Sequence, residues 1–338
     1  MRPRYASARP AAWAIAFAAT LLLPGAPHAT GQDARAAVDR RSVRRQPDPV
    51  DRTRLFKYLM GTSMRIEVYG GSEADRQAAA TEAFAAIAEV DRIMSSYRPD
   101  SEISRMNATA TSAGVVASGP LFAVLEAGQR MTSGSGGAFS LTAAPHDAGA
   151  LVLDAATRRV RLTRPVVVSV DGLAKGFAAE LAAGSLTRRG LAGTIDTSGT
   201  QFMVGTPPGH SSWSVGIGDP RQPGNVLGAI DLTSGAVATV SGLSAPRDPR
   251  TGTVAAAVLS ATVVSADGTV ADALSRALFV LGAQDGLPLL ASYHGTWGVV
   301  ASRAPDGSIA VAVSPGHDRA FHPARAARRA DPRVGPGS

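Results

Sequence analysis

The chain has 338 residues, of which 45% are hydrophobic and 18% are charged, so it carries enough apolar material to bury at least one core. Its formal net charge is +7, but the excess arginine lies in residues 1–54 and 319–338, and the segment between them holds slightly more acid than base. Because the body has no positive field, nucleic-acid binding is not expected. The absence of cysteine excludes a disulfide framework, thiolate metal sites and a cysteine nucleophile.

The first residues have the layout of a secretory signal peptide. Three arginines precede an apolar run over residues 11–23, and Pro24 with several small residues follows. A run of about 13 residues is short for a bilayer span, although an uncleaved anchor is the alternative interpretation. We therefore expect residues 1–29 to be removed, the product to be periplasmic or otherwise secreted, and the mature chain to have no stable membrane span.

The rest of the chain divides by composition. Residues 30–54 are charged and show no apolar period, which is typical of a flexible leader. Residues 316–338 are rich in Ala, Arg and Pro, and we expect a disordered tail there. Residues 55–315 lack an obvious linker or internal repeat and are expected to form one domain.

Helical and strand patterns alternate along this domain. Met64, Ile66 and Val68 alternate with polar residues and predict a half-buried strand. Ser72 is positioned to cap a helix over residues 73–94, whose apolar residues recur every three or four positions. Pro120 is expected to open a second helix that ends near Ser133.

Further along the chain the same signals predict two more helices and six more strands. The helices are expected over residues 173–189, stopped by Gly190, and over residues 271–281, ended by Gly282. The strands are expected at 166–170, 213–217, 229–233, 236–240, 296–301 and 308–313. This order predicts an α+β fold with mixed, largely antiparallel sheets packed by helices.

Two segments could hold a planar ligand. In Tyr58–Thr62, Met60 and the glycine after it could set an apolar side chain and a close backbone over a ring, or the segment could simply enter a strand. In the polar loop after residue 94, Tyr97 could stack on a flavin or adenine ring. The alternative for this loop is a capped connection between two helices.

Two further segments suit phosphate binding. The glycine-rich stretch 134–142 permits positive φ angles and backbone donation, or it is only a flexible loop. Residues 169–178 run from an expected strand into a helix, where backbone amides and Lys175 could face a phosphate. Lysine occurs at only two of the 34 basic positions, which suggests that its shape is needed here.

Asp272 stands in the first turn of an expected helix, where it could bind Mg²⁺ or complement the helix dipole. The sequence has no HExxH, GxSxG, Walker-A or EF-hand pattern, and its six histidines lie at no metal-ligand spacing. The commonest hydrolase and metalloenzyme classes are therefore excluded.

In this order, from about Phe56 to Gly282, these segments resemble the ApbE family of FAD:protein FMN transferases. The resemblance implies an ApbE-like fold and a reaction that moves FMN from FAD to a Ser or Thr of a target protein, with release of AMP. It also implies Mg²⁺ on the pyrophosphate, held by the Gly172 carbonyl and Asp272. The FAD contacts that it implies are Met60, Tyr97, Ala138, Phe139, Ser140 and Lys175, to which we add Ser169.

The chain departs from the family pattern at four places. Ser169 stands where the family usually has Asp, and Ser140-Leu141-Thr142 replaces Asp-Pro-Thr. Ala245 stands at the position of a His, and Arg276 at that of a metal-ligating Thr. A guanidinium cannot ligate Mg²⁺ but can neutralise a phosphate, while Ser275 could offer a metal-binding oxygen.

We therefore take Asp272, Ser275 and Arg276 as the candidate catalytic residues, with Ser275 also a candidate metal ligand. The partners expected are FAD and an acceptor protein with a Ser or Thr flavinylation site. The alternatives are an FAD-binding protein with weakened catalysis, a Mg²⁺-dependent FAD pyrophosphatase, and an unrelated secreted α+β protein.

Overall fold

The computed structural model describes residues 51–111, 113–142, 147–222, 224–242, 245–324 and 328–329. The expected signal peptide and nearly all of the expected leader lie outside these residues, so their prediction stays untested. Within the described residues, no helix is both long enough and apolar enough to span a bilayer.

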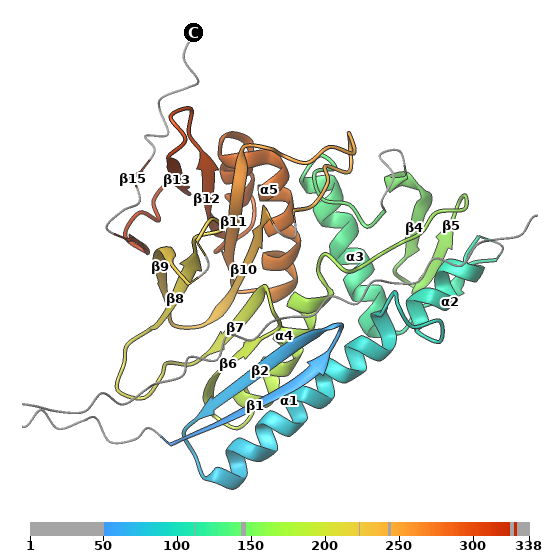
Figure 1. Cartoon of the computed structure of the whole chain (residues 1–338). Coiled ribbons are helices and arrows are strands. Elements are labelled where there is room, and N and C mark those ends of the chain that lie inside the picture. Colours follow the sequence, from blue (N-terminus) through green and yellow to red (C-terminus); the bar gives the residue numbers. More distant parts are fainter. Residues whose placement is uncertain are drawn as a thin grey trace, which may run out of the picture. The chain divides into compact units, whose positions relative to one another are not determined.

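A nine-stranded sheet forms the centre of the fold (Figure 1). Neighbouring strands run antiparallel, except that β13 and β15 pair in parallel. In spatial order the strands are β1 (Arg52–Leu59), β2 (Thr62–Tyr69), β6 (Ala192–Asp196), β7 (Thr200–Val204), β10 (Gly235–Ser241), β11 (Val258–Ser265), β12 (Trp297–Arg303), β13 (Ile309–Val313) and β15 (Arg328–Arg329).

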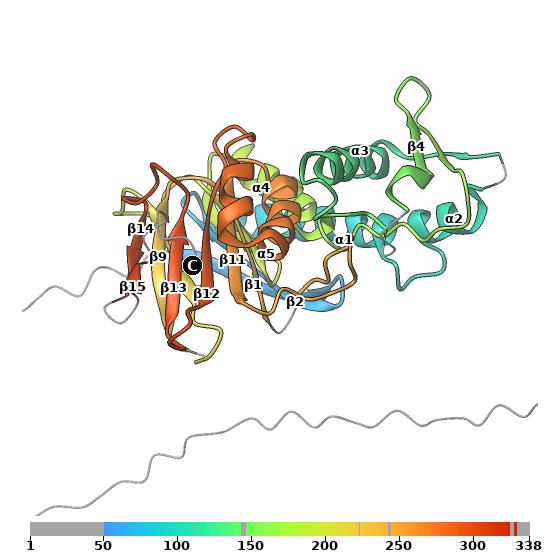
Figure 2. The same cartoon turned by 90° about the horizontal axis from the view of Figure 1, so that it is seen from above.

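Three helices cover one face of this sheet: α1 (Glu73–Met94), α4 (Ala174–Thr187) and α5 (Gly268–Leu290). They lie side by side in Figures 1 and 2. The period of two in a strand divides β10 between the two faces, because Ala236 and Ala238 pack with the helices while Val237 faces away.

A small sheet covers the other face of the large one. Its strands, in order, are β14 (Phe321–Pro323), β9 (Val226–Leu232) and β8 (Trp213–Gly218). Ile217, Ile230 and Phe321 from this sheet form a second core with Val237 and Val299 of the large sheet. The layers are therefore small sheet, large sheet and helices, an α+β arrangement of mainly antiparallel sheets as the sequence predicts.

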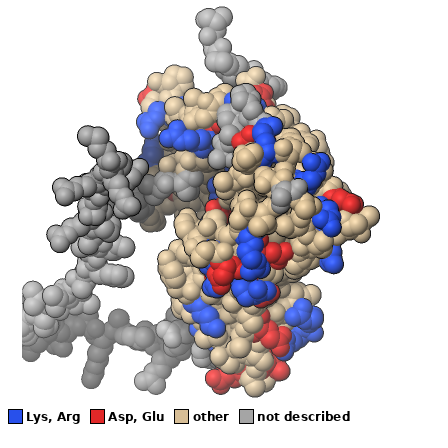
Figure 3. Space-filling view, turned by 90° about the vertical axis from the view of Figure 1, so that its right-hand side faces the viewer, with Lys and Arg blue, Asp and Glu red and all other residues tan. Residues whose placement is uncertain are grey.

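A third sheet lies beside α2 (Glu102–Thr109) and α3 (Gly119–Gly134) (Figure 2). Its order is β3 (Val115–Val116), β5 (Arg159–Leu162) and β4 (Leu151–Asp154), and a short 3-10 turn, η1 (Ala148–Ala150), precedes β4. α3 contacts both α1 and α5. The face shown in Figure 3 carries basic and acidic side chains intermixed rather than a field of one sign.

The predicted helix ends are found where side chains satisfy them. Ser72 caps α1 in a capping box with Asp75. Gly282 has φ 70° and ψ −167°, which ends the first segment of α5, and a second segment continues to Leu290. The expected helix over 271–281 is therefore the first part of a longer, kinked element.

Both domain boundaries need correction. The leader was expected to reach residue 54, but β1 begins at Arg52, because Arg52 and Arg54 form ion pairs with Glu67 of β2. The tail was expected to be disordered from residue 316, but Phe321 is only 1% exposed and pairs with Ile230. Burial of one aromatic side chain holds the chain against the small sheet as far as Pro323.

The expected strand at residues 166–170 is absent. Val168 forms an isolated bridge to Thr142. The side chain of Asn107 forms hydrogen bonds with both the N–H and the carbonyl of Val168. Asn107 Oδ1 accepts from the Val168 N–H at 3.0 Å, and its Nδ2 donates to the Val168 carbonyl at 2.9 Å. An amide side chain thus replaces a neighbouring strand and leaves an extended loop.

Candidate functional site

One cavity of about 420 Å³ opens between the β1–β2 turn, the end of α1 and the first turn of α4. Met60, Tyr97, Lys175 and Arg276 are among its lining residues. Its wall therefore offers an apolar side chain, an aromatic ring and two cations. This combination suits a ligand that has a flat ring and negative charge.

The β1–β2 turn places Met60 at the cavity wall. Met60 and Gly61 have φ angles of 50° and 73°, the pattern of a tight hairpin turn with two left-handed residues. The Tyr58 hydroxyl donates to the Gly61 carbonyl at 2.8 Å and closes the turn. A methionine in the left-handed region is uncommon, and such strain clusters at functional sites.

The loop after α1 supplies an exposed ring. Tyr97 is 88% exposed although it lines the cavity, so its face is free to stack on a ligand. Its neighbour Ser96 donates to the carboxylate of Asp171, with Oγ 3.2 Å from Oδ2. This bond ties the loop to the segment that leads into α4.

A second cavity, of about 310 Å³, lies on the other side of Asp171. Its lining includes the sequence-predicted residues Ala138, Phe139, Ser140, Ser169 and Gly172. The glycine-rich turn that precedes them has positive φ angles at residues 136 and 137, as expected for a loop that exposes its backbone.

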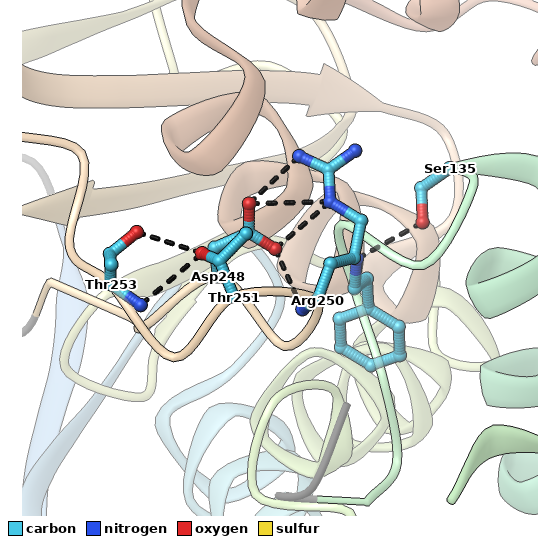
Figure 4. Close-up of polar contacts among 6 residues, drawn as sticks. Ser135, Asp248, Arg250, Thr251 and Thr253 are labelled. Atoms are coloured by element: carbon cyan, nitrogen blue, oxygen red, sulfur yellow. Dashed lines mark hydrogen bonds and ion pairs between the residues drawn. The ribbon is translucent and has the colours of Figure 1, made fainter. Parts of the chain in front are cut away.

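A turn-rich loop forms another wall of the second cavity (Figure 4). Arg250 binds both carboxylate oxygens of Asp248 at 2.9 Å, and hydrogen bonds from Arg250 hold the pKa of Asp248 below its usual value. Because this carboxylate is already paired, it is a poor proton acceptor. On the facing segment, Ser135 Oγ accepts the Phe139 N–H at 3.0 Å.

Asp171 and Arg276 line both cavities and mark their junction. Nη2 of Arg276 donates to the backbone carbonyl of Asp171 at 3.3 Å. A side chain at Gly172 would place its Cβ 2.8 Å from the Phe139 ring and 3.1 Å from Cδ of Arg276. Glycine at residue 172 therefore lets Phe139 and Arg276 approach the junction.

Asp272 lies beneath this junction and lines neither cavity. It is 6% exposed, and its Oδ2 accepts the Gly176 N–H at 3.0 Å. Burial raises the pKa of Asp272, while the charge of Arg276 and the Gly176 hydrogen bond oppose that rise. Asp272 can therefore affect a ligand in either cavity only through the residues that separate it from them.

The structure brings the predicted FAD contacts together in these two cavities, with Gly172 and Arg276. It does not bring Ser275 there, because Ser275 is 1% exposed and its Oγ donates to the Asp272 carbonyl at 2.7 Å. Asp171 also lies at the junction, although no role is predicted for it from the sequence. The sequence feature that could have identified Asp171 is its position just before the start of α4.

The residues present fit a resident Mg²⁺ poorly. Asp272 is buried and already accepts a hydrogen bond, Ser275 is turned back into its helix, and Arg276 offers only donors. Over the described part of the chain, no group of three or more His, Cys, Asp or Glu side chains is arranged to hold a metal. No step of the chemistry is therefore assigned to a metal ion.

The comparisons with known proteins agree on one family. The ApbE family profile matches residues 60–300. A Treponema pallidum (strain Nichols) protein named FAD:protein FMN transferase is 30% identical over 293 residues, covering 70% of this chain and 81% of that protein. A Rhodobacter capsulatus protein of the same name is 33% identical over 163 residues, covering 44% of this chain and 31% of that protein.

A solved structure shares the fold. The crystal structure of the ApbE protein from Thermotoga maritima superposes with a TM-score of 0.71 at 22% identity, covering 80% of this chain and 99% of the other. The chain belongs to the ApbE family.

Proposed function

We propose that this chain moves FMN from FAD to a Ser or Thr hydroxyl of an acceptor protein and releases AMP. The observation that carries this proposal is the pair of adjoining cavities that share Asp171 and Arg276. FAD has two ring-bearing halves joined by a pyrophosphate, so one half in each cavity sets the pyrophosphate at the junction. The Treponema pallidum and Rhodobacter capsulatus relatives are both named FAD:protein FMN transferase, which supports the proposal.

In the transfer, the acceptor hydroxyl oxygen attacks the phosphorus of the FMN half. A new phosphate ester bond forms, the bond from this phosphorus to the bridging oxygen breaks, and AMP leaves with the electron pair. Charge grows on that leaving oxygen, and the Arg276 guanidinium is the cation at the junction that stabilises it.

The hydroxyl proton needs an acceptor, and Asp171 is our candidate. Among the described lining residues, it is the carboxylate that both cavities share, and it is exposed. Ser96 donates to it, but no cation in the described part of the chain is paired with it, whereas Asp248 is held by Arg250. Asp171 can therefore act as the general base for the acceptor hydroxyl.

Incubation of the purified chain with FAD and a candidate acceptor protein tests the proposal. Transfer yields AMP and an acceptor heavier by one FMN group in equal amounts, measured by chromatography and intact-mass spectrometry. Equal amounts of free FMN and AMP without a labelled acceptor would instead identify an FAD pyrophosphatase. FAD binding without either product would identify a flavin-binding protein.

We further propose that the chain acts outside the cytoplasm after removal of residues 1–29. The support is the charged, apolar and small-residue order of that segment. N-terminal sequencing of the exported protein should find a start near residue 30, and an intact Met1 on a cytoplasmic product would contradict it. Mg²⁺ stays a prediction of the family resemblance, and the residues around Asp272 argue against it.

A further inference from the structure

The guanidinium of Arg276 has unused binding capacity. Its Nε is buried and has no hydrogen-bond partner among the described residues. Its one hydrogen bond there is the long contact of 3.3 Å from Nη2 to the Asp171 carbonyl, which is a neutral group. A buried donor that lacks an acceptor is unfavourable unless a ligand supplies one.

The position of this cation selects the kind of ligand. Arg276 and Asp171 line both cavities, so a group bound to Arg276 touches the contents of both. Lys175, in the first turn of α4, lines the first cavity beside it. A guanidinium fork with a nearby ammonium at a helix start suits the oxygens of a phosphate group.

We propose that Arg276 binds the pyrophosphate of FAD directly, at the position where the family resemblance implies a metal-ligating Thr, so that FAD binding needs no Mg²⁺. This inference rests on the proposed function. The inference depends on residue 276, which lies one helical turn after Asp272 on the same face of α5. A side chain with an oxygen at this position could be a metal ligand beside Asp272. Arginine offers only nitrogen donors there.

Asp272 fits this arrangement as a buried counter-charge. Its carboxylate is held by the Gly176 N–H, and the charges of Arg276 and Lys175 act on it. This buried carboxylate balances part of the charge of the two cations. Asp171 adds negative charge at the junction, but Arg276 contacts its backbone carbonyl and not its carboxylate.

The test measures FAD and riboflavin affinity by flavin fluorescence, with Mg²⁺ and with a chelator. Wild-type protein should bind FAD with the same affinity in both conditions. Arg276→Ala should lose on the order of tenfold in FAD affinity, because a charge-assisted phosphate contact is removed. It should bind riboflavin as the wild type does, since riboflavin has no phosphate.

Two further variants sharpen the result. Arg276→Thr should bind FAD tightly only with Mg²⁺, because the hydroxyl restores an oxygen beside Asp272. Arg130→Ala is the control, an exposed arginine of α3 that pairs with Glu126, and it should change neither affinity. Circular dichroism checks that each variant is folded.

Three outcomes would overturn the inference. The first is a wild-type FAD affinity that collapses in chelator. The second is an Arg276→Ala variant that binds FAD as the wild type does, or that loses FAD and riboflavin affinity equally. The third is a wild-type chain that binds no FAD in either condition, which would also end the proposed function, whereas the first two leave that function intact.

Discussion

The N–H of Gly176 and the carboxylate of Asp272 join two helices at their first turns, at an N to Oδ2 distance of 3.0 Å. The contact is possible because α4 and α5 approach closely at their starts. A Cβ on Gly176 would lie 2.0 Å from the carbonyl oxygen of Gly268, and one on Gly268 would lie 2.4 Å from that of Gly176. Two glycines therefore set the depth of Asp272 below the cavities.

Gly176→Ala should destabilise the chain by roughly 1–3 kcal/mol or more, because a backbone atom obstructs the new methyl group and cannot move as a side chain could. Thermal unfolding followed by circular dichroism measures it. The matched control is Gly184→Ala in the same helix, where the nearest atom is the end of Arg188 at 3.2 Å. That control should be neutral or stabilising by up to about 1 kcal/mol from helix propensity, and an equal loss in both variants would contradict the close approach.

Asp272→Asn separates the two accounts of the site. Asparagine keeps the shape and an oxygen for the Gly176 N–H but removes the charge that opposes FAD phosphates. If Arg276 binds the pyrophosphate, FAD affinity in chelator should rise severalfold, because one negative charge that repels the phosphates is removed. If Asp272 were a metal ligand, FAD affinity measured with Mg²⁺ should instead fall. Fluorescence titration in both conditions distinguishes these results.

Much of the fold could be predicted from local signals. The periodicity of α1 and its Ser72 cap are contained in neighbouring residues, as is the break at Gly282. The prediction of a strand at 166–170 was wrong, because the local apolar pattern gives no sign that the side chain of Asn107, 61 positions before Val168, binds this backbone. Likewise, the sequence could not predict that Phe321 packs on β9, because it stands in a segment rich in Ala, Arg and Pro.

The candidate site shows the same limit. Family resemblance located the lining residues, since ring and phosphate contacts sit on short motifs. It could not separate Arg276, which lines both cavities, from Ser275 and Asp272, which line neither. That distinction depends on the rotation of α5 against α4, which the Gly176–Gly268 contact sets. The same contact places Asp272 under the junction rather than in it.

Asp171→Asn should lower the rate of FMN transfer by roughly 10²–10⁴-fold while FAD affinity changes little, because the amide cannot accept the hydroxyl proton. Initial rates of acceptor labelling at saturating FAD measure it. Raising the pH should partly restore the rate by increasing the fraction of ionised hydroxyl. The control is Asp91→Asn, which changes a carboxylate that lines the first cavity only. An unchanged rate in Asp171→Asn would remove Asp171 from the mechanism.

Glu180 and Asp267 place two carboxylates at the start of α5, where Oε2 of Glu180 accepts the Gly268 N–H at 2.9 Å. Burial, and then the charge of Asp267, raise the pKa of Glu180 above its ordinary value of 4.5. The folded state therefore binds this proton more tightly than the unfolded state does. The stabilising contribution is complete below pH 4.5 and is lost as the pH rises through the raised pKa.

Glu180→Gln removes this titration but keeps an oxygen for the Gly268 N–H. Its melting temperature should match that of the wild type in mild acid and exceed it once the pH has risen through the raised pKa of Glu180. Glu82→Gln is the control of opposite sign, because hydrogen bonds from Arg189 lower the pKa of Glu82. Glu82 contributes stability above its ordinary pKa that is lost as the pH falls, so this variant should be less stable near neutral pH. Melting temperatures measured across this pH range test both signs. If the melting temperature of Glu180→Gln followed that of the wild type at every pH, the pKa of Glu180 would not be raised in the folded state.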